Sequence, residues 1–179
     1  MKGWNRAQGG VSVLYGIVRE LNPQTVVELG TDAGNSAASI AKALRDNDEG
    51  GKLISVDNWC CNAARERKDA TVAKQRLADN GLDAGLVEFV TSDSQAYLKA
   101  CGDDSVDMVF VDADHRYHQA LADTREALRV AKYLVVVHDT DQPEVRLALE
   151  QLGGLGRWAS LGRDVWVSTP LKGEHYGNV

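Results

Sequence analysis

The stretch LGRWASLGRDVWVSTP, residues 155–170, decides the fold class, because it holds two short segments suited to β-strands with no helix between them. The segments meet at Leu161 and Gly162, where a tight turn can form. We therefore predict an antiparallel hairpin here. Parallel strands need long crossover connections instead, so this hairpin limits the architectures that suit the rest of the chain.

Upstream of the hairpin, short β-rich runs alternate with longer stretches of helical periodicity. The predicted strands are residues 25–29 (TVVEL), 52–56 (KLISV), 86–90 (LVEFV), 106–111 (VDMVFV) and 133–138 (YLVVVH). The predicted helices include residues 4–21, 35–46, 115–131 and 143–152. One face of helix 35–46 carries Ala37, Ile40, Ala41 and Leu44, and one face of helix 115–131 carries Tyr117, Leu121, Thr124 and Leu128. We predict an α/β fold, doubly wound, with a mostly parallel seven-stranded sheet that ends in the antiparallel hairpin.

The composition favours a single domain over residues 1–179, with an N-terminal helix in residues 1–22 and a core in residues 23–179. The net charge of −6 disfavours nucleic-acid binding. The one basic stretch, residues 65–68, is interrupted by Glu66 and suits a solvated helix face. No apolar run approaches membrane-spanning length, and residues 1–10 lack a secretory signal, so we expect a cytoplasmic protein without a membrane partner.

The three cysteines, Cys60, Cys61 and Cys101, are odd in number and lack the spacing of a zinc site. We expect reduced thiols. The adjacent pair could also react together, although packing is the commoner role for cysteine.

Acidic and glycine residues follow the first three predicted strands. Glu28 ends the first strand, and Gly30 and Gly34 lie in the turn before the next helix. Asp57 ends the second strand and Asp93 follows the third. The carboxyl ends of parallel strands meet at one edge of a sheet, where open α/β sheets bind their ligands. Glycines in a tight turn are weak evidence by themselves, but together with the carboxylates they predict a cofactor site.

The fourth and fifth predicted strands also end in polar residues. Asp112, Asp114 and His115 follow the fourth strand, and His138 and Asp139 follow or end the fifth. Neighbouring strands lie about 4.8 Å apart, so Asp112 and Asp139 could converge. Two converging carboxylates repel each other unless a cation or a proton lies between them, and such oxygen ligands suit Mg²⁺. We interpret Asp114 as the N-cap of the following helix. The alternative for His115 is a solvated residue in the first helical turn.

The segment VVELGTDAGNSAA, residues 26–38, resembles the Glu/Asp-x-Gly-x-Gly-x-Gly loop of class I methyltransferases that use S-adenosylmethionine (SAM), with Asp32 in place of the middle glycine. The terminal hairpin also suits that fold better than a nicotinamide-binding Rossmann domain. The resemblance implies that Asp57 binds the ribose and Asp93 the adenine amino group. The residues expected to bind SAM are Glu28, Gly30, Thr31, Asp32, Gly34, Ser36, Asp57, Asn58, Trp59, Ser92, Asp93, Ser94 and Asp112.

The segments VDADHRYHQALAD and VVVHDT resemble the metal-dependent O-methyltransferases of methyltransferase family 24, which act on catechols and sugar hydroxyls. The resemblance implies a metal ion, Mg²⁺, on Asp112 and Asp139, and His115 as the catalytic base beside Asp112. After the fifth strand, these enzymes carry an acidic residue followed by Asp, or Asp followed by Asn in the catechol type. Here His138 takes the first of the two positions, so it is a further candidate ligand. The expected partner is a small-molecule hydroxyl acceptor, either a sugar, a catechol-like compound or a natural product.

Two other functions remain open from the sequence. One is an oxidoreductase of the NAD type, although the Gly-x-Gly-x-x-Gly pattern is absent and Asp32 would repel a pyrophosphate. The other is a SAM- or nucleotide-binding domain without catalysis. The sequence leaves open the identity of the acceptor and whether the chain forms a homo-oligomer.

Overall fold

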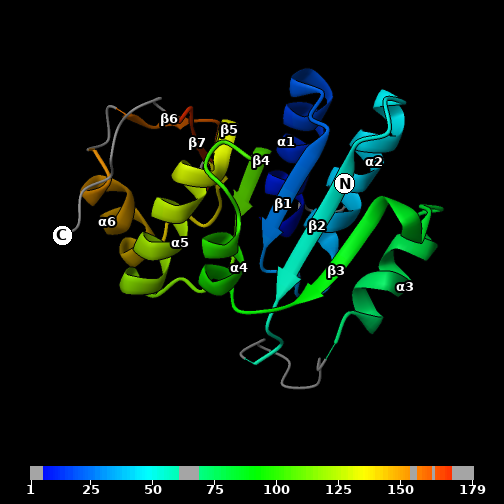
Figure 1. Cartoon of the computed structure of the whole chain (residues 1–179), viewed down its shortest axis with the longest axis horizontal. Coiled ribbons are helices and arrows are strands. Elements are labelled where there is room, and N and C mark those ends of the chain that lie inside the picture. The colour runs from blue at the N-terminus through cyan, green and yellow to red at the C-terminus, as the bar shows by residue number, and fades with distance from the viewer. Residues whose placement is uncertain (1–5, 61–68, 154–156, 163, 171–179) are drawn as a thin grey trace.

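The computed structural model describes residues 6–60, 69–153, 157–162 and 164–170, which form one sheet with helices on both faces (Figure 1). The helices are α1 (Arg6–Leu21), α2 (Asn35–Asn47), α3 (Thr71–Asp79), α4 (Ser94–Ala100), α5 (Tyr117–Val130) and α6 (Pro143–Gln151), with a short 3₁₀ turn η1 (Ala84–Leu86). The strands are β1 (Thr25–Leu29), β2 (Lys52–Asp57), β3 (Val87–Thr91), β4 (Val106–Val111), β5 (Ala131–Val137), β6 (Ala159–Ser160) and β7 (Trp166–Ser168).

The sheet has the strand order β3-β2-β1-β4-β5-β7-β6. Strands β1 to β5 pair in parallel, whereas β7 pairs antiparallel with both β5 and β6. The predicted seven-stranded sheet and its antiparallel hairpin are therefore confirmed. Strands β2 and β3 are added on one side of β1, whereas β4 and β5 are added on its other side, so the switch point of the sheet lies between β1 and β4.

Each face of the sheet buries its own core, because successive residues of a strand point to opposite faces. On one face, Val109 and Val111 of β4 pack with Leu128 of α5 in a cluster that also includes residues of α4 and α6. On the other face, Met108 and Phe110 of the same strand pack in a cluster with residues of α1, α2 and α3. None of the helices in the described ranges has both the length and the apolar character needed to span a bilayer.

Several predicted boundaries need correction. Strand β5 begins two residues earlier than predicted, at Ala131, because the chain passes from α5 to the strand without a loop. It ends at Val137, one residue before the predicted end at His138. Strand β3 begins one residue later than predicted, since Leu86 belongs to the 3₁₀ turn. Helix α1 is described from Arg6. Cys61 and the predicted basic helix face at residues 65–68 lie outside the described residues.

Candidate active site

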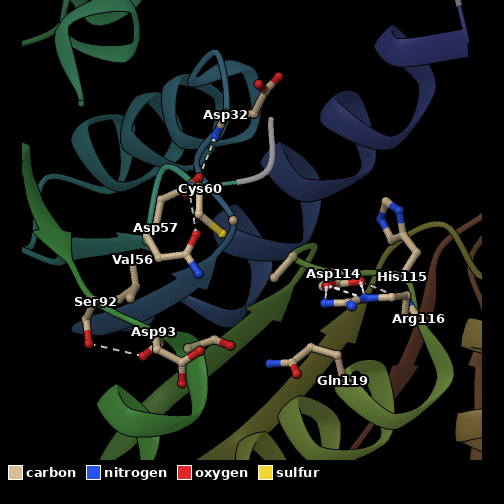
Figure 2. Close-up of a pocket in the computed structure, with 14 residues that line it drawn as sticks. Asp32, Val56, Asp57, Cys60, Ser92, Asp93, Asp114, His115, Arg116 and Gln119 are labelled. Atoms are coloured by element: carbon tan, nitrogen blue, oxygen red, sulfur yellow. Dashed lines mark hydrogen bonds and ion pairs between the residues drawn. The ribbon is translucent and has the colours of Figure 1, made fainter. Parts of the chain in front are cut away.

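A pocket of about 610 Å³ lies at the carboxyl ends of the parallel strands. Its volume is in the range typical of small-molecule sites. Figure 2 shows side chains from the β2 and β3 ends on one side, and side chains from the β4–α5 segment on the opposite side. The pocket is lined by Gly30, Asp32, Val56, Asp57, Asn58, Cys60, Ser92, Asp93, Ser94, Ala113, Asp114, His115, Arg116 and Gln119.

The loop after β1 requires glycine at two positions. Gly30 has φ +91°, and a Cβ there would lie 2.1 Å from the backbone oxygen of Asp112. Gly34 has φ +77°, and a Cβ there would lie 2.7 Å from the Cβ of Ala73 in α3. Gly30 thus lets the β1 and β4 loops approach each other, whereas Gly34 lets α3 pack against the start of α2. Asp32, in place of a middle glycine, also has positive φ (+43°).

Asp57 holds this loop in place from the end of β2. Its Oδ2 accepts the backbone N–H groups of Thr31 at 2.9 Å and of Asp32 at 3.1 Å, the second of which Figure 2 shows. Its Oδ1 accepts the N–H of Trp59 at 2.7 Å. A carboxylate oxygen accepts about two hydrogen bonds, so Oδ1 retains capacity for one ligand hydroxyl. Asp57 can therefore contact a ribose, as predicted, and it also shapes the loop.

Glu28 lies beneath the loop and does not line the pocket. Its side chain is fully buried, Ser55 donates a hydrogen bond to its Oε2, and Ser55 is in turn bonded to the hydroxyl of Thr31. Burial raises the pKa of Glu28 to about 8, opposed by hydrogen bonding to Ser36. Buried Glu28 and Thr31 and half-buried Ser36 thus support the glycine turn from beneath. Their direct contact with a cofactor stays a prediction.

Asp93 and Ser94 form the far end of the pocket at the start of α4. Asp93 is the N-cap of this helix, and its Oδ1 accepts the backbone N–H of Ala96 at 3.0 Å. Ser94 donates to Oδ1 of Asp123 in α5 at 2.8 Å, and burial raises the pKa of Asp123 to about 7. Among the remaining predicted residues, Asn58 and Ser92 line the pocket, while Trp59 is buried behind it.

The predicted role of Asp114 as N-cap of α5 is wrong. The cap position is Arg116, whose backbone N–H and guanidinium both donate to the carboxylate of Asp114. Glu144 in the first turn of α6 instead accepts the backbone N–H of Tyr117 at 2.8 Å. Asp114 lies two residues before the cap position, and its carboxylate accepts the N–H of Arg116 instead of an N–H of the first helical turn.

Asp112, His138 and Asp139 converge beside the pocket. Each offers one ligand atom, and these atoms lie within 4.8 Å of one another. His138 Nδ1 lies 3.3 Å from Asp112 Oδ1 and 3.5 Å from Asp139 Oδ1. His115 Nε2 reaches the same group, 3.0 Å from Asp139 Oδ2 and 3.7 Å from Asp112 Oδ1. The residues predicted at the ends of β4 and β5 are thus brought together.

The carboxylates in this group control the charge of both histidines. Asp112 and Asp139 raise the pKa of His115 to about 9. Burial disfavours the charge on His138, but interactions with the same two carboxylates outweigh it and raise the pKa to about 10. His115 and His138 in turn hold the pKa of Asp139 well below its usual value. Asp139 also has φ +51°, a strained conformation for a non-glycine residue that is common at functional sites.

Asp164 is a residue of this site that the sequence did not reveal. It lies between β6 and β7, and its Oδ2 is 3.7 Å from His138 Nε2. The backbone N–H of Thr140 donates to the carbonyl of Asp164 at 3.2 Å, which ties the hairpin to the loop after β5. Only the antiparallel pairing of β7 with β5 brings the two segments together, so no local sequence signal could have found the contact.

The switch-point pocket and the antiparallel β7 together define a class I methyltransferase fold. The chain belongs to the methyltransferase domain family, whose sequence profile matches residues 27–140. A relative from Mycolicibacterium smegmatis, named as a candidate O-methyltransferase, is 30% identical over 103 residues, which are 58% of this chain and 44% of that protein. The chain thus matches less than half the length of this curated relative.

Solved structures show the same fold. The O-methyltransferase TomG from Streptomyces achromogenes, in complex with SAM and involved in tomaymycin synthesis, has a TM-score of 0.66 and 25% identity, covering 92% of this chain and 80% of that one. An O-methyltransferase from Bacillus cereus in complex with S-adenosylhomocysteine (SAH) has a TM-score of 0.67 and 17% identity, covering 95% and 83%.

Proposed function

We propose that the protein transfers a methyl group from SAM to a hydroxyl group of a small molecule. The observation that carries this proposal is one continuous pocket that runs from Asp57 and Asp93 to His115, beside the pair Asp112 and Asp139. The proposed cofactor-binding residues and His115, which can accept a proton, thus line the same pocket. Family membership and the SAM-bound relative TomG support the same cofactor.

The chemistry of the lining residues supports SAM as the ligand. The cofactor supplies a methyl group already activated by a sulfonium centre, so the chain must chiefly orient the acceptor. Asp57 retains acceptor capacity for a ribose hydroxyl, and Asp93 and Ser94 lie at the end where the resemblance expects adenine. Asp32 and Asp57 add negative charge near a cationic ligand, which favours SAM over a dinucleotide phosphate.

A divalent cation is part of this proposal. The donor set of two carboxylates and an imidazole suits such an ion, and His115 Nε2 is buried beside them without an aligned hydrogen-bond partner. Asp112 and Asp139 would hold the ion, which would orient the acceptor oxygen and lower its pKa. Mg²⁺ is the ion that the family resemblance implies.

His115 is the proposed proton acceptor. It lines the pocket, and it is the residue there most easily adapted to proton transfer near neutral pH. It can accept a proton only in its neutral form, whereas Asp112 and Asp139 favour the charged form in this structure. The role of base therefore requires these carboxylates to be engaged elsewhere, as they would be by a bound cation.

Turnover separates this function from a binding domain without catalysis. Purified protein is incubated with SAM, a divalent salt and a panel of catechols, sugars and phenolic natural products, and SAH is quantified by mass spectrometry. We expect acceptor-dependent SAH formation that is lost in His115→Ala. Tight SAM binding without turnover on any acceptor class would favour the non-catalytic alternative. An oxidoreductase would instead bind NAD in the same pocket.

A further inference from the structure

We propose that His138 is a nitrogen ligand of the metal ion, and that the site therefore prefers a transition-metal ion such as Co²⁺ or Zn²⁺ over Mg²⁺. This inference rests on the proposed function in one respect, namely that the ion lies beside the methyl acceptor. It departs from the Mg²⁺ that the family resemblance implies, because here a histidine stands between the two carboxylates.

The donor geometry is the first support. Asp112 follows β4 and His138 and Asp139 follow β5, two neighbouring parallel strands, so the three side chains leave the sheet at the same edge. His138 Nδ1 faces Oδ1 of both carboxylates, at 3.3 Å and 3.5 Å. The nitrogen and the two oxygen atoms lie within 4.8 Å of one another, so they can converge on a common ion after a small adjustment of the side chains.

The second support is the environment of the other ring nitrogen. Nε2 of His138 faces Asp164 Oδ2 at 3.7 Å, and the ring also packs edge to face against Phe110, with centroids 6.2 Å apart. Metal-ligating histidines commonly direct their second nitrogen to a carboxylate, which fixes the tautomer and the ring orientation. In this proposal Asp164 takes that role for His138, whose Nδ1 faces Asp112 and Asp139.

Ligand chemistry then determines the class of ion. Mg²⁺ is a hard cation that takes oxygen ligands and retains several waters, whereas imidazole suits Zn²⁺ and other later transition metals. His138 supplies such an imidazole beside the two carboxylates. A site with a nitrogen donor therefore binds Co²⁺ or Zn²⁺ more tightly than Mg²⁺.

Calorimetry on chelator-stripped protein tests the preference, with Co²⁺ and Mg²⁺ as probes. We expect Co²⁺ to bind about tenfold or more tightly than Mg²⁺, with a visible absorption spectrum distinct from that of free Co²⁺. His138→Asp should weaken Co²⁺ binding about 10- to 100-fold, change that spectrum and shift the preference toward Mg²⁺. Asp164→Asn should weaken Co²⁺ binding by a similar factor through the ring orientation.

The control is Asp141→Asn, an exposed carboxylate on the same loop, which should leave Co²⁺ affinity unchanged. Circular dichroism and SAH binding verify that each variant is folded. Absence of metal binding, or equal Co²⁺ and Mg²⁺ affinities that His138→Asp does not alter, would overturn the proposal and leave His138 as a bridge between carboxylates. Metal binding without SAH binding would instead refute the proposed function and leave this inference standing.

Discussion

His115 is the residue on which the proposed chemistry depends most. If it accepts the proton, His115→Ala should lower turnover about 10²- to 10⁴-fold and leave SAH affinity nearly unchanged, because the proton moves only on the way to the transition state. His118→Ala is the matched control, an exposed histidine one turn along the same segment. Near-normal turnover of the His115 variant on the true acceptor would show that His115 is not the base and only pairs with Asp139.

Asp57 shapes the loop after β1, and we propose that it also binds the ribose. Asp57→Ala removes the proposed ribose contact and the hydrogen bonds to the N–H groups of Thr31 and Asp32, so SAH affinity should fall at least about tenfold. Asp57→Asn keeps one acceptor oxygen and should show a smaller loss. Calorimetry measures affinity, and urea unfolding shows whether the loop effect also lowers stability. Unchanged SAH affinity in Asp57→Ala would contradict the ribose assignment.

At the scale of elements, Gly34 is required for α3 to pack against α2. Gly34→Ala adds a Cβ 2.7 Å from that of Ala73 in a backbone with φ +77°, so we expect a loss of about 2–5 kcal/mol in unfolding free energy. Gly50→Ala is the control, because its φ of +74° carries the same strain but nothing lies within 4 Å. It should cost about 1–2 kcal/mol. Equal losses in urea unfolding would show that the contact with α3 contributes nothing.

The elements themselves show what the sequence could predict. Strands β1 and β4 have the predicted bounds, because their apolar runs are flanked by polar residues. The start of β5 at Ala131 was missed, since α5 runs into the strand without a turn signal. The cap role of Asp114 was wrong because Glu144 of α6 supplies the contact to α5 from a distant part of the chain. Local sequence patterns therefore predict which helices and strands form, whereas contacts between distant segments determine where some of them begin and end.

In the candidate active site, too, some positions could be predicted from the sequence and others depend on tertiary contacts. The convergence of Asp112 and Asp139 could be predicted, since parallel neighbouring strands end at one edge. Asp164 could not, because its place depends on how the hairpin folds back on β5. The buried position of Glu28 was also missed, because a residue at a strand end can point to either face of the sheet.

At the scale of the whole molecule, buried Glu28 should make stability depend on pH. Burial raises its pKa from 4.5 to about 8 in the folded state, so folding favours the protonated form. That stability is complete below pH 4.5 and is lost as the pH rises toward 8, on the order of 3–5 kcal/mol. Glu28→Gln stays neutral and should lose less stability over this range. Parallel pH curves for the two proteins in urea unfolding would contradict the burial effect.

We expect the pocket at the carboxyl ends of β1–β4 to bind SAM rather than a dinucleotide. The most direct measurement is calorimetric titration of the purified protein with SAH and, in the same buffer, with NAD. We predict saturable binding of one SAH per chain, weakened in Asp57→Ala, and no measurable binding of NAD. Binding of NAD in place of SAH, or no binding of SAH at all, would contradict the account.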